Sequence, residues 1–188
     1  CVVHDSQFEP NVAVGDGGYV VRSQIGLHSY LGLRCIVADS KIGRYCSIAS
    51  NVSIGSGSHP LARNVSTHPI FHLRRLPEWD LVPRDTFDEF RPTQVGSDVW
   101  IGTNAVLRDG VTVGDGAVIG AGSIVTRDLE PYGVYAGVPA RLLRLRFDET
   151  VVERLLQIKW WDRDFSWIRR HALTFADVDR FLQDTSDL

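Results

Sequence analysis

One histidine is placed where its side chain could act on a bound molecule. His59 lies in the segment Gly57-Ser58-His59-Pro60, and both Gly57 and Pro60 constrain the backbone around it. A neutral imidazole has a pKa near 6.5, so it can accept a proton from a hydroxyl or an amine at physiological pH. An ordinary surface histidine would also fit this turn. We therefore take His59 as a candidate general base, to be judged by its context.

Four arginines occur within twenty positions near the end of the regular part of the chain. The chain carries a formal net charge of -3, so this cluster is a local positive region in a protein that is acidic overall. Guanidinium groups bind phosphates well, which makes the cluster a candidate anion site. A solvated charged face is the alternative interpretation. The cluster consists of Arg127, Arg141, Arg144 and Arg146.

Neither the thiols nor the histidines predict a metal centre. Cys1, Cys35 and Cys46 show no Cys-x-x-Cys spacing, and Cys35 falls on an apolar position, so buried thiols in a reducing compartment are expected. His68 and His72 are four residues apart, but Pro69 disfavours a helix that would present both on one face. No metal is expected, and no activated nucleophile is evident for an acyl-enzyme step.

The elements that must position these residues follow a six-residue repeat. Aliphatic residues recur at every sixth position, usually with Gly directly after them, and small or apolar residues return four positions later. Each unit predicts one short strand and one tight turn, with Gly tolerating positive φ and leaving room at the corner. Three units close one coil, so the fold class is all-β, a parallel β-helix. The repeat is clearest at Val95, Ile101, Leu107, Val113, Ile119 and Val125, and its second positions are Val99, Ala105, Val111, Ala117, Ser123 and Leu129.

The repeat also defines the domains by where it stops. It begins earlier and less regularly, from Ile25 onward, and disappears over about 59–93, which predicts a loop extruded from the coil. We expect residues 1–145 to form the β-helix domain with this loop. Residues 146–188 form a C-terminal helical extension, with helices expected over Asp148–Trp160, where Thr150 and Glu153 would form a capping box, and over Thr174–Leu182. These helices are expected to pack on the coil or cover its end.

Composition excludes several classes of protein. The 188 residues, 44% of them hydrophobic, suffice for a sizeable core. The pI near 6.1 gives no general attraction to nucleic acid, and no apolar run reaches the roughly 18 residues of a membrane span. A cytoplasmic protein is expected.

Several motifs, in this order, resemble the hexapeptide-repeat acyltransferases, and in particular their xenobiotic acetyltransferase and sugar O-acetyltransferase branch. The resemblance covers about residues 25–160 and implies a left-handed coil and acetyl-CoA as the donor. The motifs are Gly-Ser-His-Pro at 57–60, Ser-Thr-His-Pro-Ile-Phe at 66–71, Val-Trp-Ile-Gly at 99–102, Ile-Gly-Ala-Gly-Ser-Ile-Val-Thr-Arg-Asp at 119–128 and Ala-Gly-Val-Pro-Ala-Arg at 136–141.

The resemblance implies a role for each matching residue. His59 would be the general base in direct acetyl transfer to a hydroxyl of a small acceptor, and the active sites would form between the subunits of a homotrimer. Trp100 is an outward aromatic residue that would line the acceptor groove or pack on a neighbouring subunit. The loop residues His68 and Phe71, with Trp79 and Asp80, would shape the acceptor pocket. The positions that match coenzyme contacts are Gly102, Thr103, Ala121, Thr126, Arg127, Arg141 and Arg144.

The acceptor stays open between two classes. Aromatic and polar residues in the loop suit a saccharide, which we favour, and they also suit a chloramphenicol-type or streptogramin-type antibiotic. Transfer to the amine of an amino sugar is a further alternative. A γ-class carbonic anhydrase uses a similar coil with three zinc-binding histidines on adjacent coils, but none of the six histidines lies between Val95 and Leu145. A coil without enzymatic activity, used as a spacer or trimerisation module, would need neither His59 nor the arginine cluster.

Overall fold

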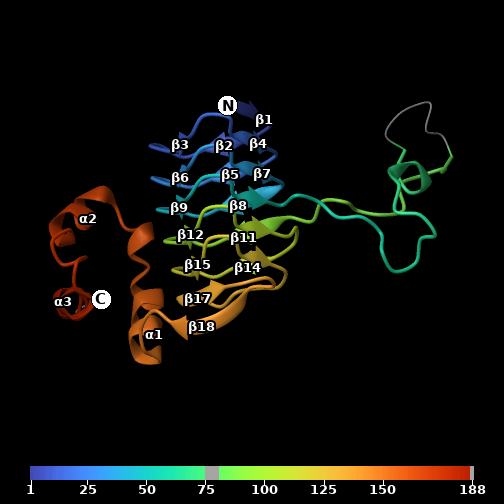
Figure 1. Ribbon diagram of the computed structural model, residues 1–188. Helices are drawn as coiled ribbons and strands as arrows, with labels where there is room; N and C mark the ends of the chain where they lie inside the picture. The colour runs from blue at the N-terminus through green and yellow to red at the C-terminus, as the bar shows by residue number, and fades with distance from the viewer. Residues whose placement is uncertain (75–80, 187–188) are drawn as a thin grey trace.

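The six-residue repeat folds into short strands that stack in parallel on three sheets, as the computed structural model shows for residues 1–74 and 81–186 (Figure 1). The first sheet contains β1 (Val2–His4), β4 (Tyr19–Val21), β7 (Ile36–Ala38), β10 (Ser53–Ile54), β13 (Val106–Leu107) and β16 (Ile124–Val125). The second contains β2 (Gln7–Phe8), β5 (Gln24–Ile25), β8 (Ser40–Ile42), β11 (Thr93–Val95) and β14 (Thr112–Val113). The third contains β3 (Ala13–Val14), β6 (Tyr30–Leu31), β9 (Ser47–Ile48), β12 (Trp100–Ile101), β15 (Val118–Ile119), β17 (Gly133–Ala136) and β18 (Arg141–Leu145).

These sheets form a three-sided parallel β-helix, which confirms the predicted fold class; the left hand of the coil stays a prediction. Among the described residues the strands pair in parallel, except β17 with β18, which are antiparallel at the end of the coil. The repeat's aliphatic side chains fill the core, and so do the residues four positions later. Ile101 and Ala105, one of each kind, are both fully buried. Burying such side chains is the main force that holds the coil together.

The glycines after each aliphatic residue serve packing rather than turn geometry. A Cβ atom on Gly102 would lie 2.5 Å from the backbone nitrogen of Ala121 on the next coil, and one on Gly43 would lie 2.6 Å from backbone atoms of Gly96. Gly43 and Gly102 do not have positive φ, although Gly55, which follows Ile54, does, with φ 71°. Positive φ occurs two residues further on, at Asn104 for example, with φ 59°. The sequence-based expectation was therefore right about room at the corner and right about positive φ at Gly55, whereas after Gly43 and Gly102 the left-handed backbone falls two residues later.

The three lines of corners between the sheets differ in what covers them. We call the corners from the first to the second sheet the arm edge, because the long loop leaves the coil there, between β10 and β11. The corners from the second to the third sheet form the helix edge. The corners from the third to the first sheet, such as that between β12 and β13, form the open edge.

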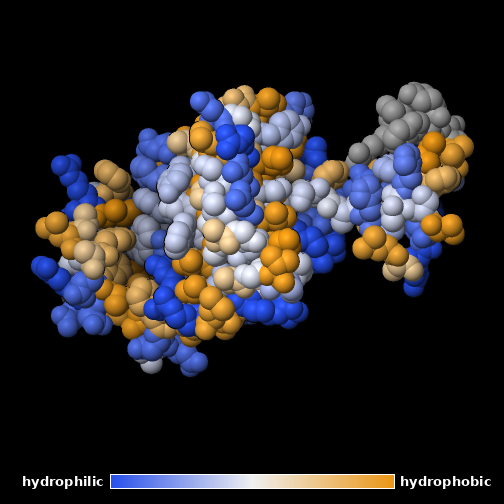
Figure 2. Space-filling model, in the orientation of Figure 1, coloured by the Kyte–Doolittle hydropathy of each residue, from blue (hydrophilic) through white to orange (hydrophobic). Residues whose placement is uncertain are grey.

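The arm edge already departs from the six-residue repeat in earlier coils. Val20 and Ile25 bracket this edge with a spacing of five, and so do Val37 and Ile42. The fourth coil inserts residues 55–92 at the same place, an excursion that projects away from the coil (Figure 1). We call this excursion the arm. It exposes apolar side chains, visible at its surface in Figure 2, among them Leu61, Val65, Phe71 and Leu81.

Three helices follow the coil and pack along the helix edge. Trp160 lies 4.8 Å from the ring of Tyr45, and Phe165 lies 6.0 Å from the ring of His28. The helices share a second apolar cluster around Leu155 and Ile158. They are α1 (Glu149–Ile158), α2 (Phe165–His171) and α3 (Val178–Asp184). Among the described residues no helix is long and apolar enough to span a membrane.

The helix boundaries differ from the sequence-based expectation at three points. Asp148, not Thr150, caps α1 by accepting a hydrogen bond from the Val151 backbone N–H. The helix expected over Thr174–Leu182 begins later, as α3, where the Asp177 side chain caps it. The helix α2 was not expected, because its seven residues show too little periodicity to be recognised.

Candidate active site

His59 lies at the base of the arm, where hydrogen bonds tie the two ends of the arm to the coil. The backbone N–H of Ser58 donates to the Glu89 carbonyl at 2.8 Å, closing the arm. The Ser58 hydroxyl and the Arg91 Nε both lie 3.2 Å from one carboxylate oxygen of Asp109, which is fully buried on the next coil. The position of His59 is therefore fixed relative to a rigid scaffold.

The ring of His59 is held in a defined tautomer. Its Nδ1 lies 3.0 Å from the backbone carbonyl of Thr67. A carbonyl oxygen only accepts hydrogen bonds, so Nδ1 carries the hydrogen and Nε2 of the neutral ring keeps its lone pair. The side chain is exposed. An accessible Nε2 with a free lone pair is the form that a general base requires.

Two further side chains gather around His59. The ring of His72 stands edge-on to it, with the centroids 6.2 Å apart. His72 is fully buried, and its Nε2 lies 3.5 Å from a carboxylate oxygen of Glu89. The sequence suggested comparing His72 with His68, but the structure pairs it with His59 instead. His68 accepts a hydrogen bond at the start of the short helix η1 (Pro69–Phe71).

The residues expected to contact the acceptor lie in two places within one chain. His68 and Phe71 stand exposed on the arm. Trp100 is 54% exposed on the outer face of the third sheet, on the other side of the coil from the arm edge. Trp79 and Asp80 lie outside the described residues. A single chain therefore does not bring Trp100 together with the arm.

Three of the positions expected to contact the coenzyme stack on the open edge. Gly102 and Thr103 follow β12, and Ala121 follows β15 directly on the next coil. The Thr103 hydroxyl donates to the Ser50 carbonyl at 2.7 Å, and the Gly122 backbone N–H donates to the Thr103 carbonyl at 2.8 Å. These bonds link three successive coils into a rigid wall at this edge.

The remaining four positions lie elsewhere. Thr126 and Arg127 follow β16 and lie on the arm edge, whereas Arg141 and Arg144 lie on β18. The three arginines are exposed. Arg141 and Arg144 donate to the carbonyls of adjacent residues, and none of the three forms an ion pair within residues 1–74 and 81–186. Their charges remain available to an anion.

Arg146 does not belong to that set. Its guanidinium lies 3.0 Å from the Asp98 carboxylate and within 5.3 Å of the ring centroids of Tyr132 and Phe147. It also donates to the Gly116 carbonyl at 2.7 Å. Arg146 therefore joins the coil to the C-terminal extension, and the arginine cluster expected from the sequence has three exposed members instead of four.

The cysteines offer no nucleophile in the core. Cys35 and Cys46 are buried and unpaired, as expected, and Cys1 is exposed. Burial raises the pKa of the Cys46 thiol to about 12, so this thiol stays protonated at neutral pH. This leaves attack by the acceptor itself as the simplest route for a group transfer.

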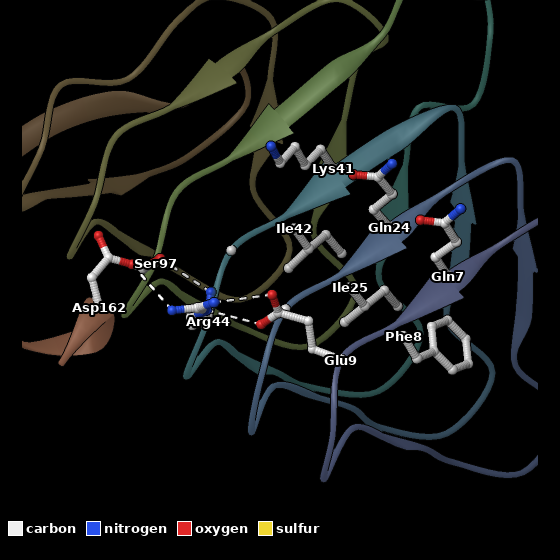
Figure 3. Close-up of a pocket in the computed structure, with 12 residues that line it drawn as sticks. Gln7, Phe8, Glu9, Gln24, Ile25, Lys41, Ile42, Arg44, Ser97 and Asp162 are labelled. Carbon is white, nitrogen blue, oxygen red and sulfur yellow. Dashed lines mark hydrogen bonds and ion pairs between the residues drawn. The ribbon is translucent and has the colours of Figure 1, made fainter. Parts of the chain in front are cut away.

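A hollow of about 420 Å³ opens on the outer face of the second sheet, and it contains none of the expected site residues. Figure 3 shows that Gln24 and Lys41 line it, and that Arg44 at one end bridges Glu9 and Asp162. The Arg44 Nε lies 2.8 Å from Glu9 on another coil, and its Nη1 lies 3.4 Å from Asp162, which fastens the segment after α1 to the coil. We assign these residues a structural role.

Known proteins share this fold and much of this sequence. Residues 92–127 match the family described as bacterial transferase hexapeptide (six repeats). A chloramphenicol acetyltransferase of Agrobacterium fabrum is 37% identical over 163 residues, which are 81% of this chain and 76% of that protein. The chain belongs to the hexapeptide-repeat acyltransferases.

Two solved structures extend this similarity to the fold. A maltose O-acetyltransferase from Clostridium difficile is 25% identical, with a TM-score of 0.61 covering 78% of this chain and 72% of that one. A hexapeptide-repeat acetyltransferase from Vibrio cholerae, complexed with acetyl coenzyme A, is 28% identical, with a TM-score of 0.51 covering 78% of this chain and 71% of that one.

Proposed function

We propose that this enzyme transfers an acetyl group from acetyl-CoA to a hydroxyl of a small acceptor, with His59 as the general base. The observation that carries the proposal is the hydrogen bond between His59 Nδ1 and the Thr67 carbonyl. It leaves Nε2 unprotonated on an exposed residue at the base of the arm. The V. cholerae relative bound to acetyl coenzyme A supports the choice of donor.

The reaction needs one proton acceptor and no covalent enzyme intermediate. Nε2 of His59 takes the proton of the acceptor hydroxyl while the hydroxyl oxygen attacks the thioester carbonyl carbon. The tetrahedral intermediate then expels the coenzyme thiolate, which takes the proton back from the His59 imidazolium. The products are an acetyl ester and free coenzyme A, and His59 returns to its neutral form. The Thr67 carbonyl keeps the ring in one tautomer throughout.

The site is assembled between chains of a homotrimer. His59, Thr126 and Arg127 lie on the arm edge, whereas Gly102 and Thr103 lie on the open edge. These two edges flank the first sheet on opposite sides. When three coils pack around an axis with their first sheets facing inward, the open edge of each coil meets the arm edge of its neighbour. The exposed apolar side chains of the arm then cover the adjacent chain.

The coenzyme lies in the groove between two such edges. Gly102, Thr103 and Ala121 offer backbone close to the pantetheine arm, because glycine and alanine leave room beside the coil. Arg127, Arg141 and Arg144 hold the phosphates, since their guanidinium groups are exposed and without carboxylate partners among the described residues.

The acceptor is a hydroxylated small molecule held between the arm and the third sheet of the neighbouring chain. His68 and Phe71 approach it from the arm, and Trp100 approaches from the coil. An aromatic ring stacks well on a sugar face, and a saccharide is the class we favour from the loop composition. The similarity to a chloramphenicol acetyltransferase supports the antibiotic alternative, so both classes enter the test.

The test measures free thiol released from acetyl-CoA over a panel of sugars, glycosides, chloramphenicol-type and streptogramin-type acceptors. One class should give saturable release, and His59→Ala should lower turnover by roughly 10²–10⁴-fold because the base is lost. His4→Ala, which removes an exposed histidine paired with Asp5 on the first coil, serves as the matched control and should leave turnover unchanged. Unchanged turnover in His59→Ala would remove His59 from this role, and no release with any acceptor would remove the proposed reaction.

A further inference from the structure

His59 lies beside two buried side chains, His72 and Glu89, which have no role in the proposed acetyl transfer. His59, His72 and Glu89 each offer one ligand atom, and these atoms all lie within 4.8 Å of one another. His72 is fully buried, with 0% of its surface accessible, and Glu89 is 7% accessible. Two imidazoles and a carboxylate form a ligand set that zinc uses in proteins.

His72 is the feature that demands an explanation. Both of its ring nitrogens are buried without a hydrogen-bond partner in the described part of the chain. Burying an unsatisfied polar atom costs roughly 1–3 kcal/mol, so such atoms usually have a ligand or a partner. Its Nε2 lies 3.5 Å from the Glu89 carboxylate, which is about the separation of two ligands on one tetrahedral metal ion.

The tautomer of His59 suits a metal as well as a proton. Histidines that bind metals usually donate their other ring N–H to a carbonyl or carboxylate, which orients the ring. The Thr67 carbonyl, 3.0 Å from Nδ1, performs this function and leaves Nε2 for the ion. Because His59 is exposed, an ion reaches the site from solvent, and water fills the fourth position.

We propose that His59, His72 and Glu89 form a binding site for Zn²⁺ that switches the enzyme off. The ion occupies the Nε2 lone pair of His59, which is the same pair of electrons that accepts the proton of the acceptor. Zinc binding and acetyl transfer therefore exclude each other. The binding site stands on the geometry of the three residues alone, whereas its inhibitory effect rests on the proposed function of His59.

Metal binding is measured first, without reference to activity. The full chain is stripped with EDTA, freed of chelator and titrated with Co²⁺, whose visible absorption reports four-coordinate ligation, and then with Zn²⁺ against a chromophoric chelator. We expect one ion per chain. His72→Gln should weaken Zn²⁺ binding by about 100-fold and Glu89→Gln by at least about 10-fold, the range over which even outer partners act on metal affinity.

The matched control is His4→Ala. His4 forms an exposed pair with Asp5, with 3.0 Å between Nδ1 and the carboxylate, so it represents ordinary surface binding of zinc. His4→Ala should leave the affinity unchanged. Equal affinity in the parent chain and in both His72→Gln and Glu89→Gln would overturn the site, as would the absence of bound metal in the parent chain.

The second measurement is thiol release with and without Zn²⁺. Zinc should inhibit the parent enzyme with the midpoint found for binding, and EDTA should restore turnover in full. Relative to its own turnover in EDTA, His72→Gln should be inhibited only at about 100-fold higher zinc concentration. Bound zinc without inhibition, or turnover that requires zinc, would overturn the switch. An enzyme that binds zinc as described but releases no thiol in EDTA would instead contradict the proposed function alone.

Discussion

The first and second sheets have the same interior and opposite exteriors. Inward, both present the repeating aliphatic residues of the core. Outward, the second sheet presents polar side chains along a register that runs Gln7, Gln24, Lys41, Gln94 and Thr112. The first sheet presents a mostly apolar line in register, namely Tyr19, Ile36, Ser53, Val106 and Ile124.

This difference indicates which face meets another chain. Tyr19 is 45% exposed and Ile36 is 46% exposed, an arrangement that costs free energy in water unless a partner covers it. The second sheet has no such need, because its outer side chains are solvated. The two edges that carry the candidate site residues flank the apolar sheet. The same comparison supports the proposed trimer, in which the site residues of one chain would be divided between two edges.

A single charge on each face tests the comparison most strongly. Ile36→Glu places a carboxylate in the inward-facing interface of the trimer, where desolvation of an unpaired charge costs several kcal/mol, so association should weaken by roughly 100-fold or more. Thiol release should fall with it, because the two halves of the site separate. Light scattering after size-exclusion chromatography measures the mass, and the thiol assay measures turnover.

The matched control places the same carboxylate on the other face. Gln24→Glu lies on the solvated second sheet and should change neither the mass nor the turnover. If Gln24→Glu dissociated the protein while Ile36→Glu did not, the second sheet would be the interface and our assignment would be wrong.

Mixed oligomers test separately the arm edge and the open edge that flank the first sheet. His59→Ala disables the arm edge, and Ala121→Trp fills the groove at the open edge, so each variant alone should be inactive. In randomly mixed trimers, about a quarter of the sites combine an intact arm edge from one chain with an intact open edge from its neighbour. Thiol release should recover to about that fraction of the parent value when the two variants are co-expressed.

Two further mixtures serve as controls. His59→Ala co-expressed with His4→Ala should retain about half of the parent turnover, because one working arm edge suffices for each site. Separately purified His59→Ala and Ala121→Trp trimers should stay inactive when combined without subunit exchange. Failure of the co-expressed pair to regain activity would show that one chain supplies the whole site.

The smallest effect is expected on the second sheet, at the ion pairs of Arg44. Arg44→Ala should lower the free energy of unfolding by about 0.2–1 kcal/mol, the usual value of exposed ion pairs. The hydrogen bond from Arg44, followed by that from the Leu27 backbone, lowers the pKa of Glu9 below its ordinary 4.5. The stabilisation that the ion pair of Arg44 and Glu9 provides is therefore fully present above pH 4.5, and it is lost as the pH falls through the lowered pKa of Glu9.

Urea unfolding at pH 7 and in steps below pH 4.5 measures this effect. The difference between the parent and Arg44→Ala should narrow as the pH falls. Lys41→Ala removes another cation from the same hollow without breaking either ion pair of Arg44. Because Lys41 is the weakest of the groups that lower the pKa of Glu9, its removal should change the free energy of unfolding less than Arg44→Ala does. A loss of trimer in Arg44→Ala would contradict the structural role assigned to this arginine.

Sequence reasoning gave most of the coil and only part of the site. The coil is readable because each unit repeats the same local rule, so Val95 and Val125 report the same environment. The arm follows no such rule. Glu89 lies thirty positions after His59 in the sequence, and the segment between them has no periodicity. The Thr67 group that orients the ring is a backbone carbonyl, so no side-chain type in the sequence indicates it. Arg146 looked like its neighbours in sequence, yet its pairing with Asp98 depends on how the coil stacks.

The five-residue corners of the arm edge have a consequence for how this enzyme can change. Val20 to Ile25 and Val37 to Ile42 show that the coil accepts a different chain length at this edge without losing register. The arm is an extreme use of the same tolerance. Selection could therefore lengthen, shorten or replace the arm without altering the coil, and under the proposed function this would change the acceptor while leaving the donor groove intact.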